Sequence, residues 1–249
     1  MGLADLHIHT CYSWDGTSTM SAIMQSAKNK KLNVIAITDH DTIAGHDEAR
    51  ELAPKYNMQV IPGVEISTAD GHLLAYFINK AIPANLSLIR TIELVGEQGG
   101  ICIAAHPVAR FVHAISAEAL SVAACIPAFE NVFVGVEAIN AGLFYQNSNI
   151  DAAILARKYG LSPVGNSDSH IYWTVGDAVT EFSGNSISSL RKALLTRETN
   201  PVLVAQKREF SYYYKHVSRR VLRMMGWVAN YTLPGNQYVM QRFPGTSNQ

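Results

Sequence analysis

Short apolar runs rich in β-branched residues alternate with stretches of helical periodicity along most of the chain. The runs predict strands, and the periodic stretches between them predict helices. The predicted strands are residues 3–9, 33–38, 59–67, 72–77, 101–105, 131–139, 161–166, 177–182 and 202–205, and the predicted helices are residues 20–31, 44–56, 85–98, 116–125, 149–159 and 186–196. This strand-then-helix order predicts a single α/β domain, either a parallel barrel or a doubly wound sheet.

The strands at 59–67 and 72–77 are separated by Asp70-Gly71, a dipeptide typical of two-residue hairpin turns. A turn centred there places Ala69 opposite His72. Glu65 and His72 would then be about 13 Å apart at Cα, at roughly 3.3 Å per residue along the ribbon. A bend or bulge would be needed before these two side chains could share one ion.

Histidines and acidic residues gather near the ends of the predicted strands. His7 and His9 alternate with apolar residues inside the first strand, so their imidazoles share one face. The other groups are Asp39-His40-Asp41, Glu65, His106 and Asp168-Ser169-His170. Such side chains are costly at the ends of buried strands unless they are paired or bound to a metal, and the carboxyl ends of parallel strands form one site. The sequence therefore predicts a polynuclear metal site, and mixed imidazole and carboxylate ligands favour transition metals over magnesium or calcium.

Residues beside these groups are candidates for supporting roles. One of Asp39 and Asp41 is predicted to orient an imidazole, and Glu137, near the end of strand 131–139, to support the ligands or touch substrate. Arg110, four residues after His106, is placed to bind a phosphate, because a guanidinium group matches phosphate oxygens. A solvated loop arginine is the alternative interpretation.

Composition favours a folded protein that is neither exported nor membrane-spanning. The 249 residues are 48% hydrophobic, enough for a sizeable core, and no apolar stretch approaches the length of a membrane span. Cys11, Cys102 and Cys125 are widely spaced and odd in number, which suits a reducing compartment. We therefore expect a cytoplasmic protein.

The net charge is zero but unevenly distributed. From residue 205 onward there are seven basic residues and one acidic residue, whereas the first 204 residues carry 13 basic and 19 acidic residues. An acidic body suits a site that collects cations, and residues 206–249 are predicted to form a separate basic helix and tail. Apolar residues at helix spacing across 210–228 predict a final helix packed on the barrel with its basic side outward. A dimer contact, a nucleic-acid contact and a membrane-surface helix are the alternatives.

Five ordered motifs resemble those of the polymerase and histidinol phosphatase (PHP) superfamily. They are DLHIHT at 5–10, ITDHD at 37–41, PGVEIS at 62–67, AHP at 105–107 and SDSH at 167–170. The resemblance covers about residues 4–205, and the YSWDG turn and GHLLAYF ribbon are similar to those of stand-alone phosphoesterases of the superfamily. It implies a distorted (β/α)7 barrel, to which residues 206–249 add a C-terminal helical extension. It also implies two or three bound divalent ions, which would be manganese, iron or zinc.

Carried over by position, the resemblance supplies a ligand for every metal position. His7, His9, Glu65 and Asp168 would hold the first ion, Glu65 would bridge to a second ion held by His72 and His106, and Asp15, His40 and His170 would hold a third. The implied reaction is attack on phosphorus by a hydroxide that bridges two ions. The third ion, or His170 itself, would stabilise the leaving oxygen.

The substrate implied by the resemblance is a small phosphomonoester, a nucleotide or an oligonucleotide end. The alternatives are a histidinol-phosphate-type phosphatase, metal-assisted hydrolysis of a non-phosphate bond, and a non-catalytic PHP binding module. Because every metal position has a ligand, we favour an enzyme over a binding module. No feature of the sequence indicates an oligomeric state.

Overall fold

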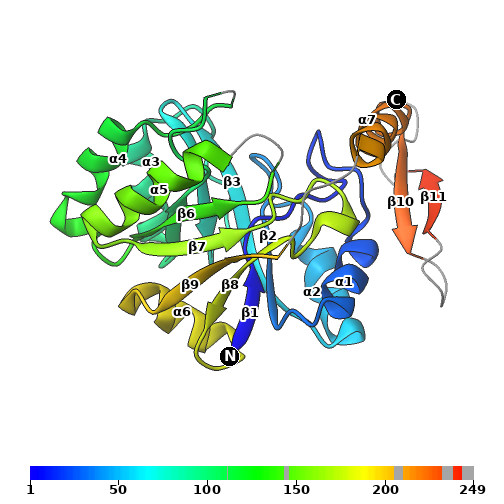
Figure 1. Ribbon diagram of the computed structural model, residues 1–249, viewed down its shortest axis with the longest axis horizontal. Coiled ribbons are helices and arrows are strands. Elements are labelled where there is room, and N and C mark those ends of the chain that lie inside the picture. Colours follow the sequence, from blue (N-terminus) through cyan, green and yellow to red (C-terminus); the bar gives the residue numbers. More distant parts are fainter. Residues whose placement is uncertain (111, 143–145, 205–209, 232–237, 243–249) are drawn as a thin grey trace.

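One curved sheet winds into a nearly closed barrel with helices on its outside (Figure 1). This computed structural model describes residues 1–110, 112–142, 146–204, 210–231 and 238–242. The sheet has the strand order β7-β6-β5-β4-β3-β2-β1-β8-β9. Its strands are β1 (Gly2–Asp5), β2 (Val34–Ile37), β3 (Gln59–Thr68), β4 (Gly71–Tyr76), β5 (Ile101–Ala104), β6 (Phe133–Asn140), β7 (Ser162–Asn166), β8 (Ala178–Phe182) and β9 (Thr199–Leu203).

The helices between these strands lie close to their predicted positions. They are α1 (Met20–Asn29), α2 (His46–Tyr56), α3 (Leu88–Glu97), α4 (Ala117–Ala124), α5 (Gln146–Tyr159) and α6 (Ile187–Thr196), with short 3-10 turns η1 (Pro127–Phe129) and η2 (Tyr172–Thr174). Serine side chains start three of them, because the hydroxyls of Ser87, Ser116 and Ser186 each accept a hydrogen bond from the backbone amide three residues later. The prediction that Ser116 begins a helix is confirmed.

The sheet is mixed, whereas the sequence predicted a parallel sheet with one hairpin, between residues 59–67 and 72–77. Strands β1, β2 and β3 run parallel to one another, as do β5, β6 and β7. Strand β4 is antiparallel to both of its neighbours, and β8 is antiparallel to β1 and to β9. The cause is the tight β3–β4 connection, because a strand that follows a two-residue turn must reverse direction.

Side chains link the two ends of the sheet and nearly close the barrel. The Thr180 hydroxyl of β8 lies 3.0 Å from both the amide nitrogen and the carbonyl oxygen of Gly165 in β7. The Thr199 hydroxyl of β9 donates to the Pro163 carbonyl oxygen at 2.8 Å. A Cβ on Gly165 would lie 2.6 Å from the Val179 carbonyl oxygen, so glycine permits this close approach. The predicted distorted barrel is confirmed.

The C-terminal extension is a helix followed by a hairpin, docked on the loop between β1 and α1. Helix α7 (Phe210–Met224) fits the predicted final helix, whereas the hairpin of β10 (Trp227–Tyr231) and β11 (Tyr238–Arg242) was not predicted. The Ala229 amide donates to the Thr17 carbonyl oxygen at 3.1 Å, and the Thr19 amide donates to the Ala229 carbonyl oxygen at 2.9 Å. The predicted domain boundary at residue 205 lies outside the described residues.

Helix α7 has the opposite orientation to the predicted one. Its arginines face the barrel, where Arg223 donates to the Cys11 carbonyl oxygen at 2.6 Å and the Arg219 guanidinium lies 4.5 Å from the Trp173 ring centroid. Val217 and Met224 are 60% and 87% exposed. The reason is that the barrel rim presents backbone carbonyls and aromatic faces, which a guanidinium satisfies and an aliphatic stripe does not. Among the described helices, none is long and apolar enough to cross a membrane.

Candidate metal centre

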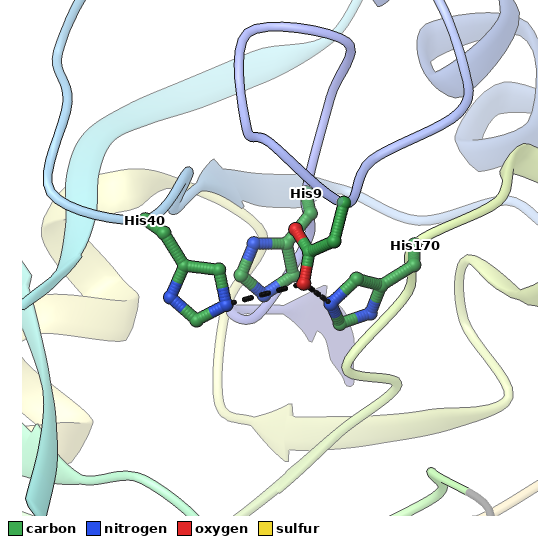
Figure 2. A group of neighbouring side chains, drawn as sticks. His9, His40 and His170 are labelled. Atoms are coloured by element: carbon green, nitrogen blue, oxygen red, sulfur yellow. Dashed lines mark hydrogen bonds and ion pairs between the residues drawn. The ribbon is translucent and has the colours of Figure 1, made fainter. Parts of the chain in front are cut away.

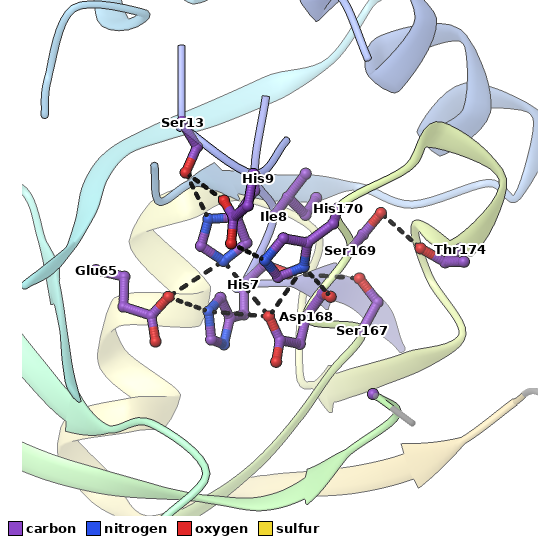
Figure 3. A network of polar contacts seen from close by, with 12 residues as sticks. His7, Ile8, His9, Ser13, Glu65, Ser167, Asp168, Ser169, His170 and Thr174 are labelled. Carbon is purple, nitrogen blue, oxygen red and sulfur yellow. Dashed lines mark hydrogen bonds and ion pairs between the residues drawn. The ribbon is translucent and has the colours of Figure 1, made fainter. Parts of the chain in front are cut away.

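The strands of the barrel bring nine predicted ligands together at one end. Figure 3 shows five of them: His7, His9, Glu65, Asp168 and His170. His40, His106, Asp168 and His170 follow the ends of β2, β5 and β7, Glu65 and His72 lie within β3 and β4, and Asp15 lies in the loop after β1. The sequence predicted that His7 and His9 lie inside the first strand. Strand β1 ends at Asp5, however, so both histidines lie beyond it. Their rings still face the same group, because the Nε2 atoms of both lie close to Glu65 Oε2, at 3.0 and 3.1 Å.

Glu65 is the centre of this group. One carboxylate oxygen, Oε2, lies 3.0 Å from His7 Nε2, 3.1 Å from His9 Nε2 and 3.3 Å from His40 Nδ1. The other oxygen, Oε1, lies 3.0 Å from both His72 Nδ1 and His106 Nε2. Since each oxygen faces its own set of imidazoles, this carboxylate has the geometry to bridge two cations.

Two aspartates complete the arrangement. Asp168 Oδ1 lies 3.4 Å from the Nε2 atoms of both His7 and His9. Asp15 Oδ2 lies 2.9 Å from His170 Nε2 and 3.4 Å from His40 Nε2 (Figure 2). Three sets of these residues have ligand atoms within 4.8 Å of one another and are the candidate metal-binding clusters. They are His9, Asp15, His40 and His170; His7, His9 and Asp168; and His40, Glu65 and His72.

The β3–β4 turn explains how His72 reaches Glu65 without a bulge. Thr68 pairs with Gly71 and Ser67 with His72, so the turn residues are Ala69-Asp70 and the predicted turn is one residue out of place. His72 is therefore a diagonal neighbour of Glu65, close enough for contact. Gly71 lies after the turn, with a φ of +131°. A side chain at this position would clash, because a Cβ would lie 2.2 Å from the Ile115 backbone nitrogen.

The electrostatics of the cluster fit divalent cations. Burial opposes a charged His9 ring, but contacts with Asp168 and Glu65 outweigh it and raise the pKa of His9 to about 10. Burial likewise opposes a charged Glu65, but the surrounding imidazoles hold the pKa of this carboxyl well below its usual range. The buried atoms His9 Nε2 and His72 Nδ1 lie close to carboxylate oxygens yet make no hydrogen bond of acceptable geometry. Such converging, unsatisfied donor atoms are what a bound cation would satisfy.

A hydrogen-bonded layer beneath the cluster fixes the ligands. Glu137 Oε1 lies 3.0 Å from His7 Nδ1, and its Oε2 accepts the His106 amide at 2.7 Å. Asn140 and Asn166 donate to the same carboxylate at 2.8 and 2.9 Å. The interpretation of Glu137 as a residue that supports the ligands is therefore confirmed, since its contacts fix the ring of one histidine and the backbone of another.

The structure corrects the role predicted for Asp39 and Asp41. Asp39 accepts the Thr10 amide at 2.6 Å and the Thr10 hydroxyl at 2.8 Å, and Asp41 accepts the Ser67 amide at 2.7 Å. Within the described residues, neither makes a hydrogen bond to an imidazole. Both hold the backbone of ligand-bearing segments, because a short carboxylate beside a loop amide bonds it in preference to a more distant ring.

Three residues of the site were missed in the sequence. Asn140 and Asn166 each end a strand, and this same signal, a polar residue at a strand end, could have identified them. Trp14 stacks near His40, with ring centroids 5.8 Å apart, but an aromatic residue in a turn gives no such signal. Arg110 is exposed in the loop after His106, and its predicted contact with phosphate stays a prediction.

Comparison with known proteins places this geometry in a family. A model of the PHP domain matches residues 5–238. The chain belongs to the PHP domain family. A PHP-containing protein of Bacteroides vulgatus, a two-domain protein containing a predicted PHP-like metal-dependent phosphoesterase, has the same fold, with a TM-score of 0.68 and 19% identity over 96% of this chain and 75% of that one.

The curated relatives of this PHP chain include an uncharacterized protein and enzymes that are named for different reactions. An uncharacterized protein of Methanocaldococcus jannaschii is 43% identical over 42% of this chain and 67% of its own. A phosphoribosyl 1,2-cyclic phosphate 1,2-diphosphodiesterase of Eggerthella lenta is 34% identical over 34% of this chain and 35% of its own. A 5'-3' exoribonuclease of Haemophilus influenzae is 35% identical over 39% of this chain and 36% of its own. The matches to these two named enzymes span about a third of their lengths.

The metal-free PHP site is expected to release protons when it binds a divalent ion. Because the pKa of His9 is raised to about 10, its ring is protonated at pH 7, and a cation must displace that proton. Affinity for Mn²⁺ should therefore rise with pH throughout the neutral range, up to the pKa of His9. Titration calorimetry at pH 7 in two buffers of different ionisation enthalpy should show that binding of the first Mn²⁺ releases about one proton or more. Equal apparent enthalpies in the two buffers would contradict this expectation.

Proposed function

We propose that this PHP-family metal-dependent hydrolase cleaves a phosphoester, with a small phosphomonoester, a nucleotide or an oligonucleotide end as its substrate. The observation that carries the proposal is the position of Glu65, whose two oxygens face separate sets of imidazoles, with the Asp15 cluster beside them. Two adjacent cation positions with a third alongside suit the charge of a phosphoryl group and of its leaving oxygen.

The assignment of ligands follows the contacts. His7, His9, Glu65 and Asp168 would hold one ion, Glu65, His72 and His106 a second, and Asp15, His40 and His170 a third, with manganese, iron or zinc suited to these donors. When bound, such ions would activate a water molecule and neutralise phosphate charge. His9 and His40 also lie close to the neighbouring groups, so the three positions share one continuous shell of donors.

His170 is the residue that we assign to the leaving oxygen. Its Nδ1 lies 3.0 Å from the Asp168 carbonyl oxygen, which fixes the ring and turns Nε2 toward Asp15. Its side chain is 22% exposed, more than that of any other predicted histidine ligand, so a substrate can reach this ring. Arg110, exposed on the loop after His106, is the group that we assign to a substrate phosphate.

A cytoplasmic location accords with the free thiols of Cys11 and Cys102, which are buried and not paired with each other.

The test is a metal analysis of the purified protein followed by a phosphatase screen with added Mn²⁺. The panel would contain sugar phosphates, nucleoside monophosphates, histidinol phosphate and a 5'-phosphorylated RNA oligonucleotide, with an amide panel beside it. We expect two or three ions per chain and hydrolysis of at least one phosphoester. A fully metallated sample that cleaves none of them would overturn the proposal. Cleavage of amides alone would instead support the non-phosphate alternative.

A further inference from the structure

Trp14 is a large aromatic side chain exposed at the edge of the metal centre. It is 69% exposed, although the residues on both sides of it, Ser13 and Asp15, are buried. Its exposure does not come from a loosely held loop, because the Ser13 hydroxyl donates to Asp15 Oδ1 at 2.8 Å and accepts the His40 amide at 3.2 Å. The backbone around the indole is therefore fixed, and the ring is presented to solvent.

The indole lies next to a ligand of the third cluster. Its ring and the His40 ring are close to parallel, with an interplanar angle of 24° and centroids 5.8 Å apart. His40 Nε2 in turn lies 3.4 Å from Asp15 Oδ2. A substrate whose phosphoester is held at this cluster would thus have the Trp14 indole beside it.

A cation from the C-terminal extension lies over the same ring. The Arg220 guanidinium carbon is 5.7 Å from the Trp14 ring centroid, within the range of a cation–π contact. Its neighbours on α7 hold the helix there, since Arg223 bonds the Cys11 carbonyl and Arg219 stacks on Trp173. Among the described residues, no carboxylate forms an ion pair with Arg220. The edge of the site thus combines an exposed aromatic face with an available positive charge.

We propose that Trp14 is a stacking platform for an aromatic base, with Arg220 as the positioning residue that holds the indole, so that the substrate is a nucleotide or a nucleotide end. The inference rests on the proposed phosphoesterase function and narrows its substrate class. Base–aromatic stacking accepts any base, because every base has a π-face. The subsite therefore selects for a base over a bare sugar phosphate without choosing among bases.

The test compares adenosine 5'-monophosphate with ribose 5-phosphate, which has the same phosphoester and sugar but no base. In Trp14→Ala the ratio of kcat/KM for the two substrates should fall by about 5- to 150-fold, from the usual energy of one stacked base. Trp14→Phe should recover most of this preference. Arg220→Gln should lower it by about 2- to 5-fold, as loss of an exposed cation–π contact implies. Tyr214→Ala, an exposed aromatic substitution on the same helix, is the matched control and should not change the ratio.

Two results would overturn the inference. The first is an unchanged ratio in Trp14→Ala. The second is an equal loss on both substrates together with loss of bound Mn²⁺, which would make Trp14 a support for Asp15. Binding of adenosine, measured by titration calorimetry, separates this outcome from failure of the proposed function. If the metallated enzyme cleaves no phosphoester, a weaker adenosine affinity in Trp14→Ala would still support the platform, and an unchanged affinity would exclude it.

Discussion

Replacing Glu65 with glutamine is expected to lower phosphoesterase activity by about three orders of magnitude or more, as loss of a central catalytic group does in other enzymes. Glutamine keeps the shape of the side chain but removes its charge. The two sets of imidazoles that now face Oε1 and Oε2 would face a neutral amide, one end of which is a donor. An amide of this kind does not bridge two cations.

Metal content is the measurement that separates this cause from general damage. Glu65→Gln should retain at most one Mn²⁺ per chain after dialysis, while its far-ultraviolet circular dichroism stays that of the parent protein. Glu181→Gln is the matched control, because Glu181 lies in the same barrel on β8 and its side chain bonds only Asn200 among the described residues, at 2.8 Å. Full metal content and activity in Glu65→Gln would exclude the bridging role.

The ligand set could be predicted because its signal is local. A histidine or carboxylate at the end of an apolar run is costly without a partner, and the fold brings such ends together. Glu65, His106 and Asp168 each carry this signal within a few residues of sequence. The order of the motifs then gave the family, which the PHP match over residues 5–238 confirms.

The features that were predicted wrongly depend on contacts between distant segments. The dipeptide Asp70-Gly71 is typical of a hairpin turn. Here, however, Gly71 lies in the strand, where the Ile115 backbone leaves no room for a side chain, and the turn is one residue earlier. The orientation of α7 depends on the Cys11 carbonyl and the Trp173 ring, more than 35 residues away in each case. Helical periodicity shows that a helix has two faces, but it does not show which face meets the barrel.

Removal of the C-terminal extension, by ending the chain after Val204, is expected to weaken the Asp15 cluster selectively. The loop that carries Asp15 is held on one side by Thr10 and Asp39, and on the other by Ala229, which bonds Thr17 and Thr19. Ala229 and its neighbour Val228 are fully buried, so their loss exposes this loop. The ligands around Glu65 come from barrel strands and should keep their geometry.

The truncated chain should therefore bind about one Mn²⁺ fewer and lose about 10- to 100-fold in activity, the usual effect of releasing the groups that orient a metal ligand. Arg223→Gln should reproduce part of this loss, because Arg223 bonds the Cys11 carbonyl in the same loop. Met224→Gln, on the exposed face of the same helix, is the matched control and should behave like the parent protein. Metal titration followed by calorimetry distinguishes the clusters, since only the site that contains Asp15 should change. An unchanged number of ions and an unchanged kcat in the truncated chain would mean that the barrel alone holds Asp15, and that α7 and the hairpin serve another purpose.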